Sequence, residues 1–221
     1  MKRLALAFVL LFFVSACGPV NKPLRPTAAE MTNVKRLAIC IPAEGSFTII
    51  NERAKATATP AVLFGLTGVI VASAYNQHGD AETAKTISTN LEGISCRAVF
   101  IDSLKNSLSE SGRFTETTYF EGESKLEEMS KYDAVVTFQI ESWGLRLVER
   151  SQGDLMKPYL EVRSRMLSPS GKTLWDERDV VAGNGRNTLS SYQHERGLLK
   201  KDMEEAISEA GRRMALSLIY Q

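Results

Sequence analysis

The sequence is poor in the residues that most often carry metal or catalytic chemistry. Its 221 residues include two histidines, His78 and His194, and three cysteines. No HExxH, CxxC or GxSxG pattern is present, and the glycine-containing stretch 183–187 lacks the GxxxxGK pattern of a phosphate loop. We therefore expect no catalytic site, no metal site and no cofactor, and we predict that the protein is not an enzyme.

An excess of charge of one sign is also missing. Lysine and arginine number 27 and aspartate and glutamate 26, so the net charge is +1. Lys2 and Arg3 stand in the N-terminal segment, and without them 25 basic residues face 26 acidic ones. Because binding to nucleic acid requires a basic surface, we expect no nucleic-acid partner.

An apolar run near the N-terminus, Leu4–Val14, is too short to span a bilayer, which takes about 20 residues. Together with the positive Lys2 and Arg3 it is typical of a secretory signal. Val14, Ser15 and Ala16 precede Cys17 in an order that resembles the bacterial lipobox. The resemblance implies cleavage after Ala16, a diacylglycerol on the Cys17 thiol, and an acyl chain such as palmitate on the new amino terminus.

Two or more acyl chains give stable anchoring, because each buried CH₂ contributes about 0.8 kcal/mol. The residue after the cysteine is Gly18 rather than aspartate, which favours the outer membrane over the inner one. We therefore expect a lipoprotein anchored in the outer membrane and facing the periplasm.

The chain divides into three parts on this interpretation. Residues 1–16 are the signal peptide, and 17–33 form a lipidated tether in which Pro19, Pro23 and Pro26 favour extended backbone. Residues 34–221 form a single periplasmic domain.

The hydrophobic pattern of this domain alternates between the periods of strands and of helices. It predicts strands at 34–42, 113–120, 133–148, 159–167 and 173–181, and helices at 94–111, from 124, and at 198–220. The fold class is therefore α+β: a two-layer sandwich of a mixed or antiparallel sheet with helices on one face.

An insertion, residues 43–92, interrupts this order after the first strand. Within it, 61–75 is strongly apolar, and Gly65, Gly68 and Ala72 would share one face of a helix. Three interpretations stay open for this apolar helix: a buried core helix, a contact between copies of the chain, or a segment that enters the membrane.

Two pairs of residues also leave alternatives. Cys40 and Cys96 can form a disulfide in the oxidising periplasm or remain buried thiols. Trp143 and Trp175 can form an exposed aromatic patch, although we favour burial beneath other elements.

Three short stretches, Val34–Ile39, Tyr132–Val136 and Ser170–Trp175, carry a family resemblance. In this order, and with the lipobox, they resemble a family of bacterial envelope lipoproteins that includes the curli secretion channel, the N-terminal domain of TolB and the Pel lipoprotein. The resemblance implies a non-enzymatic subunit of a secretion or assembly machine. We expect a structural or assembly lipoprotein that associates with itself or with envelope partners. The alternative is a lipid- or glycan-binding periplasmic module.

Overall fold

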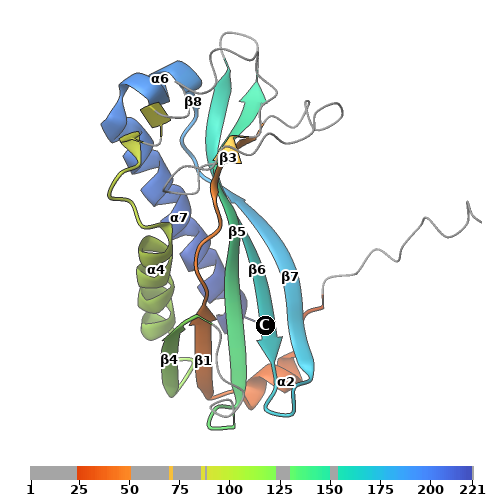
Figure 1. Ribbon diagram of the computed structural model, residues 1–221. Coiled ribbons are helices and arrows are strands. Elements are labelled where there is room, and N and C mark those ends of the chain that lie inside the picture. The colour runs from red at the N-terminus through yellow and green to blue at the C-terminus, as the bar shows by residue number, and fades with distance from the viewer. Residues whose placement is uncertain are drawn as a thin grey trace, which may run out of the picture.

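A mixed β-sheet with its two long helices on one face forms the body of the protein in the computed structural model (Figure 1). The structure describes residues 24–50, 70–71, 86–87, 89–122, 130–149 and 154–220. The strands are β1 (Arg36–Ile41), β2 (Phe47–Ile50), β3 (Ile70–Val71), β4 (Glu116–Glu121), β5 (Ala134–Glu149), β6 (Leu155–Leu167), β7 (Thr173–Ala182) and β8 (Asn187–Thr188). The helices are α2 (Ala28–Thr32), α4 (Cys96–Ser111), α6 (Leu189–His194) and α7 (Arg196–Ile219).

The long strand β5 organises the sheet. One edge of β5 pairs in parallel with β1 near its start and with β2 further along, and its other edge pairs antiparallel with β6. Beyond β1 lies the parallel strand β4, and beyond β6 lies the antiparallel strand β7. The expected α+β class with a mixed sheet is therefore confirmed.

Helices α4 and α7 cover one sheet face and pack against each other (Figure 1). Every fourth residue of α4 is buried, namely Cys96, Phe100, Leu104 and Leu108. At the crossing of the helices, a Cβ on Gly211 would lie 2.6 Å from the carbonyl oxygen of Phe100. Glycine thus allows the two helices to approach closely.

A β-bulge in β5 shifts the alternation of its side chains. The pairing with β6 slips between Ile140 and Ser142, so that Trp143 faces the same side as Ile140. Trp143 and Trp175 are both buried in the main core, which confirms their expected burial. Strict alternation along the strand would place Trp143 on the face opposite Ile140. The sequence has no clear signature of the bulge, so this shift could not be predicted.

The insertion is only partly described. Phe47–Ile50 form strand β2, which we did not predict, and Ile70–Val71 form β3 within the apolar segment that we expected to be helical. For these two residues the helical prediction is wrong, since β-branched side chains favour strands. Gly65, Gly68 and Ala72 lie outside the described residues, as does the helix expected from 124.

The prediction of an extended tether over residues 17–33 is wrong for residues 28–32. Residues 28–32 form the helix α2, and Met31 at its end is fully buried in the main core. Thr27 and Glu30 cap each other's backbone, which gives this short helix a defined start. The sequence did not indicate this helix, because Met31 is its one buried residue and a single apolar residue shows no helical period.

Candidate functional site

The N-terminal segment 24–33 is fastened along the edge strand β7, and we call it the strap. Leu24 exchanges two backbone hydrogen bonds with Asp176, of 3.1 and 2.9 Å, in an antiparallel bridge. The guanidinium of Arg25 forms an ion pair with Glu177, which also accepts a hydrogen bond from the indole of Trp175. The hydrogen bonds from Arg25 lower the pKa of Glu177.

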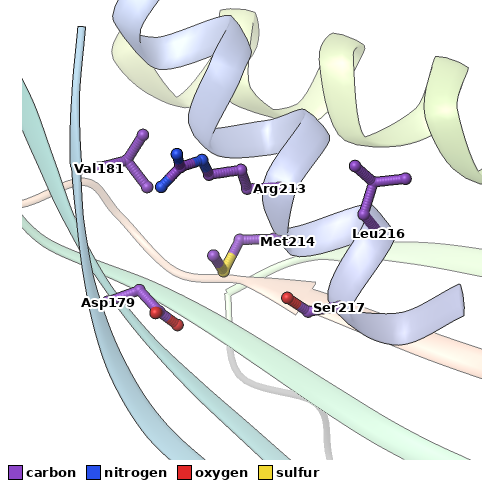
Figure 2. Close-up of a pocket in the computed structure, with 6 residues that line it drawn as sticks. All are labelled: Asp179, Val181, Arg213, Met214, Leu216 and Ser217. Carbon is purple, nitrogen blue, oxygen red and sulfur yellow. The ribbon is translucent and has the colours of Figure 1, made fainter. Parts of the chain in front are cut away.

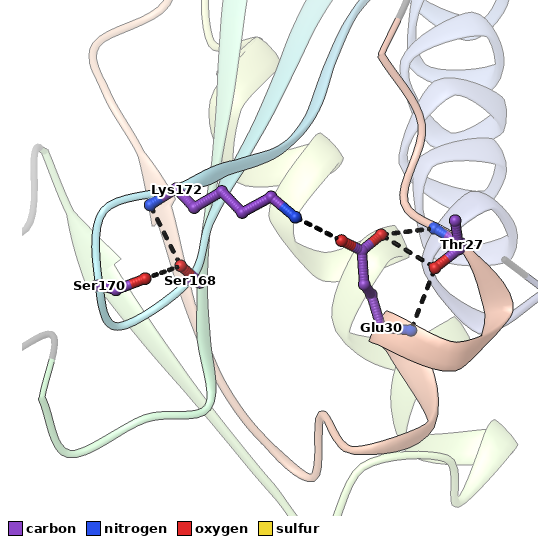
Figure 3. A network of polar contacts seen from close by, with 5 residues as sticks. All are labelled: Thr27, Glu30, Ser168, Ser170 and Lys172. Carbon is purple, nitrogen blue, oxygen red and sulfur yellow. Dashed lines mark hydrogen bonds and ion pairs between the residues drawn. The ribbon is translucent and has the colours of Figure 1, made fainter.

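The far end of the strap is held at the β6–β7 hairpin. The Lys172 ammonium lies 2.8 Å from the carboxylate of Glu30, as Figure 3 shows. The same carboxylate accepts hydrogen bonds from the backbone and hydroxyl of Thr27, and Lys172 and Thr27 together lower the pKa of Glu30 to about 2. Arg113 adds a 2.6 Å hydrogen bond to the carbonyl of Met31.

Beside the strap, β7 and the C-terminal half of α7 enclose a cleft of about 360 Å³. Figure 2 shows Asp179 and Val181 on β7 opposite the residues that α7 contributes, Arg213, Met214, Leu216 and Ser217. The lining of the cleft therefore combines apolar side chains with one hydroxyl, one acid and one base.

Asp179 is the least satisfied charge in this cleft. Burial raises the pKa of its carboxyl, and the neighbouring Glu177 raises it further, while Arg25 and Arg213 attract it. Within the described part of the chain, no hydrogen bond or ion pair reaches this carboxylate. A cation or a hydrogen-bond donor from outside would therefore find a ready acceptor here.

The outer sheet face, which lies on the other side of the sheet from α4 and α7, carries a ladder of ion pairs. Arg178 lies 2.6 Å from Glu141 and 2.9 Å from Glu161, and Arg163 makes two 3.1 Å hydrogen bonds to Asp176. These side chains link β5, β6 and β7 across the face. Pairs of this exposure stabilise a fold by only about 0–1 kcal/mol each, so the ladder fixes side-chain positions more than it adds stability.

A buried polar cluster lies beneath α6. Asp202 of α7 accepts hydrogen bonds from the hydroxyl of Tyr192, at 2.8 Å, and from the amide of Asn187, at 2.9 Å. A Cβ on Gly185 would lie 2.3 Å from the Asp202 carboxylate, so this loop passes against the acid. The close approach of Gly185 to Asp202 explains why the stretch 183–187 contains glycine at this position.

Of the two alternatives left open for Cys40 and Cys96, the structure has the buried thiols and not the disulfide. Cys96, the first residue of α4, lies in the main core, whereas Cys40 lies in a small apolar cluster with Ala38 and Val135. Neighbouring strand residues point to opposite faces, and Cys40 alternates with the core residues Ile39 and Ile41. The sheet therefore separates the two thiols.

Other predicted residues bear less on this site. Val14, Ser15, Ala16 and Cys17 lie outside the described residues, as does His78. His194 is exposed at the end of α6, where its Nδ1 lies 2.8 Å from the carbonyl of Ser190. Over the described residues, no group of acidic, histidine and cysteine side chains is arranged to hold a metal ion, and no helix is long and apolar enough to cross a membrane.

Sequence comparisons give no match to a family model and none to a curated protein. Structural comparison finds the PelC dodecamer from Paraburkholderia phytofirmans, with 14% identity and a TM-score of 0.37 over 90% of this chain and 96% of that one. A neuraminyllactose-binding hemagglutinin homolog from Helicobacter pylori has 11% identity and a TM-score of 0.35 over 91% and 94%. A lipoprotein from Neisseria meningitidis has 11% identity and a TM-score of 0.23 over 74% and 93%.

These neighbours include PelC and a bacterial lipoprotein, the kinds of protein named by the sequence resemblance. With identities of 14% or less and TM-scores of 0.37 or less, they assign neither a family nor a function to this chain.

Proposed function

We propose that this protein is an outer-membrane lipoprotein that faces the periplasm and acts through protein contacts as an assembly component of an envelope system. The observation that carries the proposal is the lipobox Val14–Cys17, followed within a few residues by a strap that is fastened to the domain. The strap gives the anchor a direct connection to the edge of the sheet.

The number of residues between Cys17 and Leu24 limits how far the strap can lie from the proposed anchor. Only residues 18–23 separate Cys17 from the bridged Leu24. At roughly 3.5 Å per residue, these residues reach at most about 21 Å. The edge of β7 is therefore held close to the membrane surface, where it can meet other anchored or membrane-embedded proteins.

Metabolic labelling tests the anchor. The wild-type protein should incorporate radiolabelled palmitate and pellet with outer membranes, and a Cys17→Ser variant should do neither. A Cys40→Ser variant is the matched control. The Cys40 thiol is buried, so its replacement should leave labelling unchanged. Equal labelling of the wild type and the Cys17→Ser variant would contradict the proposal.

A second experiment tests assembly. We propose self-association through the apolar segment 61–75, because a contiguous apolar stretch suits contact between copies. Deletion of this segment should leave a folded domain of monomeric mass by light scattering. An unchanged particle mass would exclude this route of self-association while leaving the anchor untouched.

A further inference from the structure

Among the described residues, none pairs with the outer edge of β7 beyond the strap, and we call this stretch the open edge. Strand β7 pairs with β6 on one side, and on the other side only Leu24 of the described residues bridges to it, at Asp176. Backbone groups of a strand alternate between its two edges, so those of Arg178 and Val180 point the same way as those of Asp176. Figure 1 shows β7 at the edge of the sheet, and no described residue pairs with the two successive hydrogen-bonding positions at Arg178 and Val180.

Two features that often protect an edge strand are absent from the open positions of β7. The strand contains no proline, and its only slip in register against β6 lies at Met166 and Leu167. Charged side chains, which also protect edges, are present at residues 176–179, so a partner has to match these charges. The Arg178 side chain does not shield the edge, because Glu141 and Glu161 hold its guanidinium over the outer sheet face. Val180 leaves 42% of its surface exposed.

The chemistry beside the edge differs between the two faces. An added strand would place residues opposite Val180 on the outer face, where an apolar side chain would cover the exposed valine. The next residue would face Asp179 across the cleft, where the acid has no contact partner among the described residues. A lysine or arginine at that position would add a contact ion pair to the attraction that Arg25 and Arg213 already exert on Asp179.

We propose that the open edge of β7 binds an extended segment of a partner protein, antiparallel to β7 and in line with Leu24, with an apolar residue opposite Val180 and a basic residue facing Asp179. The inference rests on the proposed function, which supplies envelope proteins as partners. Backbone hydrogen bonds to Arg178 and Val180 hold the segment, and the two side-chain positions give selectivity.

Electrostatics favours such a partner over a second copy paired about Asp179. In an antiparallel pairing of two β7 edges centred there, Asp179 would lie directly opposite the same acid of the other copy. Like charges directly opposite each other destabilise a sheet. A basic peptide instead pairs unlike charges at that position.

Peptide binding to the soluble Cys17→Ser chain without residues 1–16 tests the proposal. The probe is a fluorescent capped peptide, Thr-Val-Lys-Val-Thr, followed by anisotropy, and the control peptide has glutamate in place of lysine. We expect the lysine peptide to bind about tenfold more tightly. Asp179→Asn should reduce this preference to about twofold, because the charge that distinguishes the peptides is gone.

A backbone variant separates strand addition from simple charge attraction. Val180→Pro removes an N–H that points to the open edge, a change that edge strands tolerate, and it should reduce binding about tenfold or more. Val180→Thr keeps the N–H and should retain binding. Equal binding by Val180→Pro and Val180→Thr would overturn the proposal, as would failure of both peptides to bind.

Two further outcomes would also overturn it. One is concentration-dependent dimerisation of the peptide-free chain that Val180→Pro abolishes, since the edge would then belong to a second copy. The other is peptide binding only after residues 18–23 are replaced by glycine and serine, since the chain itself would then occupy the edge. Neither outcome bears on palmitate labelling of Cys17, so failure here is distinct from failure of the proposed function.

Discussion

Leu24 and Asp176 join the start of the described chain to its last long strand by two backbone hydrogen bonds, Leu24 N–Asp176 O at 3.1 Å and Asp176 N–Leu24 O at 2.9 Å. The bridge makes the strap a one-residue addition to β7. Force applied to the chain on the N-terminal side of Leu24 would therefore reach the sheet at Asp176 before it reaches α2.

Leu24→Pro should loosen the bridge, because proline has no N–H to donate to Asp176. Loss of one to two hydrogen bonds costs about 1–2 kcal/mol. Hydrogen exchange at the Asp176 amide should then be roughly 5–30 times faster, as measured by NMR. Leu24→Ala is the matched control, since it keeps both backbone bonds. An Asp176 amide that exchanges equally fast in the two variants would contradict the assignment of the bridge.

The hold of the strap on the hairpin should weaken in acid. The ammonium of Lys172 and the donors of Thr27 lower the pKa of Glu30 from 4.5 to about 2. A lowered pKa means that ionised Glu30 stabilises the docked strap above pH 4.5, and that this contribution disappears as the pH falls towards 2. The methyl resonance of Met31, which is buried next to Glu30, should move towards that of free methionine over this interval.

Glu30→Gln separates this titration from others nearby, such as that of Glu177, whose pKa is also lowered. In the variant, the Met31 resonance should lose the transition that belongs to Glu30. The assignment fails if the wild type and Glu30→Gln show the same pH dependence.

The parts of the fold with a clean period were predictable from sequence. Strands β5, β6 and β7 alternate apolar and polar residues, and α7 repeats its apolar residues at helical spacing, so their positions were expected within a few residues. The hairpin turn at Ser168–Gly171 also has a direct chemical signature.

The candidate site was not predictable in the same way. Its geometry depends on the pairing of Leu24 with Asp176 and on α7 leaving Asp179 uncovered, and both arise from contacts distant in sequence. Pro23 and Pro26 suggested a free tether, whereas Thr27 and Glu30, which form a capping box, were the available sign of a helix start. The sequence also does not show which of the acidic residues on β7 lies beside a cleft.

Both remaining thiols should be unreactive in the native protein. Cys40 and Cys96 are fully buried, and burial raises the pKa of the Cys96 thiol, which removes the reactive thiolate. In a Cys17→Ser chain, Ellman's reagent should modify neither thiol under native conditions and both in 6 M guanidinium. Formation of an intramolecular disulfide under mild oxidation, detected by mass spectrometry, would contradict the placement of the two residues on opposite sheet faces.

The crossing of α4 and α7 gives the sharpest test of packing, because two glycines of α7 differ in their surroundings. At Gly211 a Cβ would lie 2.6 Å from the carbonyl oxygen of Phe100 and 3.0 Å from Ser103, whereas at Gly197 it would meet nothing within 4 Å. Gly211→Ala should therefore force the helices apart and reduce the free energy of unfolding by about 1–3 kcal/mol. Gly197→Ala should instead increase it by about 0.5–1 kcal/mol, since alanine restricts the unfolded chain and favours the helix.

Thermal unfolding of the two variants measures this difference. For a chain of this size, 1 kcal/mol corresponds to about 2–4 °C in Tm, so the variants should move Tm in opposite directions by a resolvable amount. Helix propensity alone would raise Tm in both. A rise in Tm for Gly211→Ala would therefore mean that α4 and α7 do not approach as closely as the contact between Gly211 and Phe100 requires.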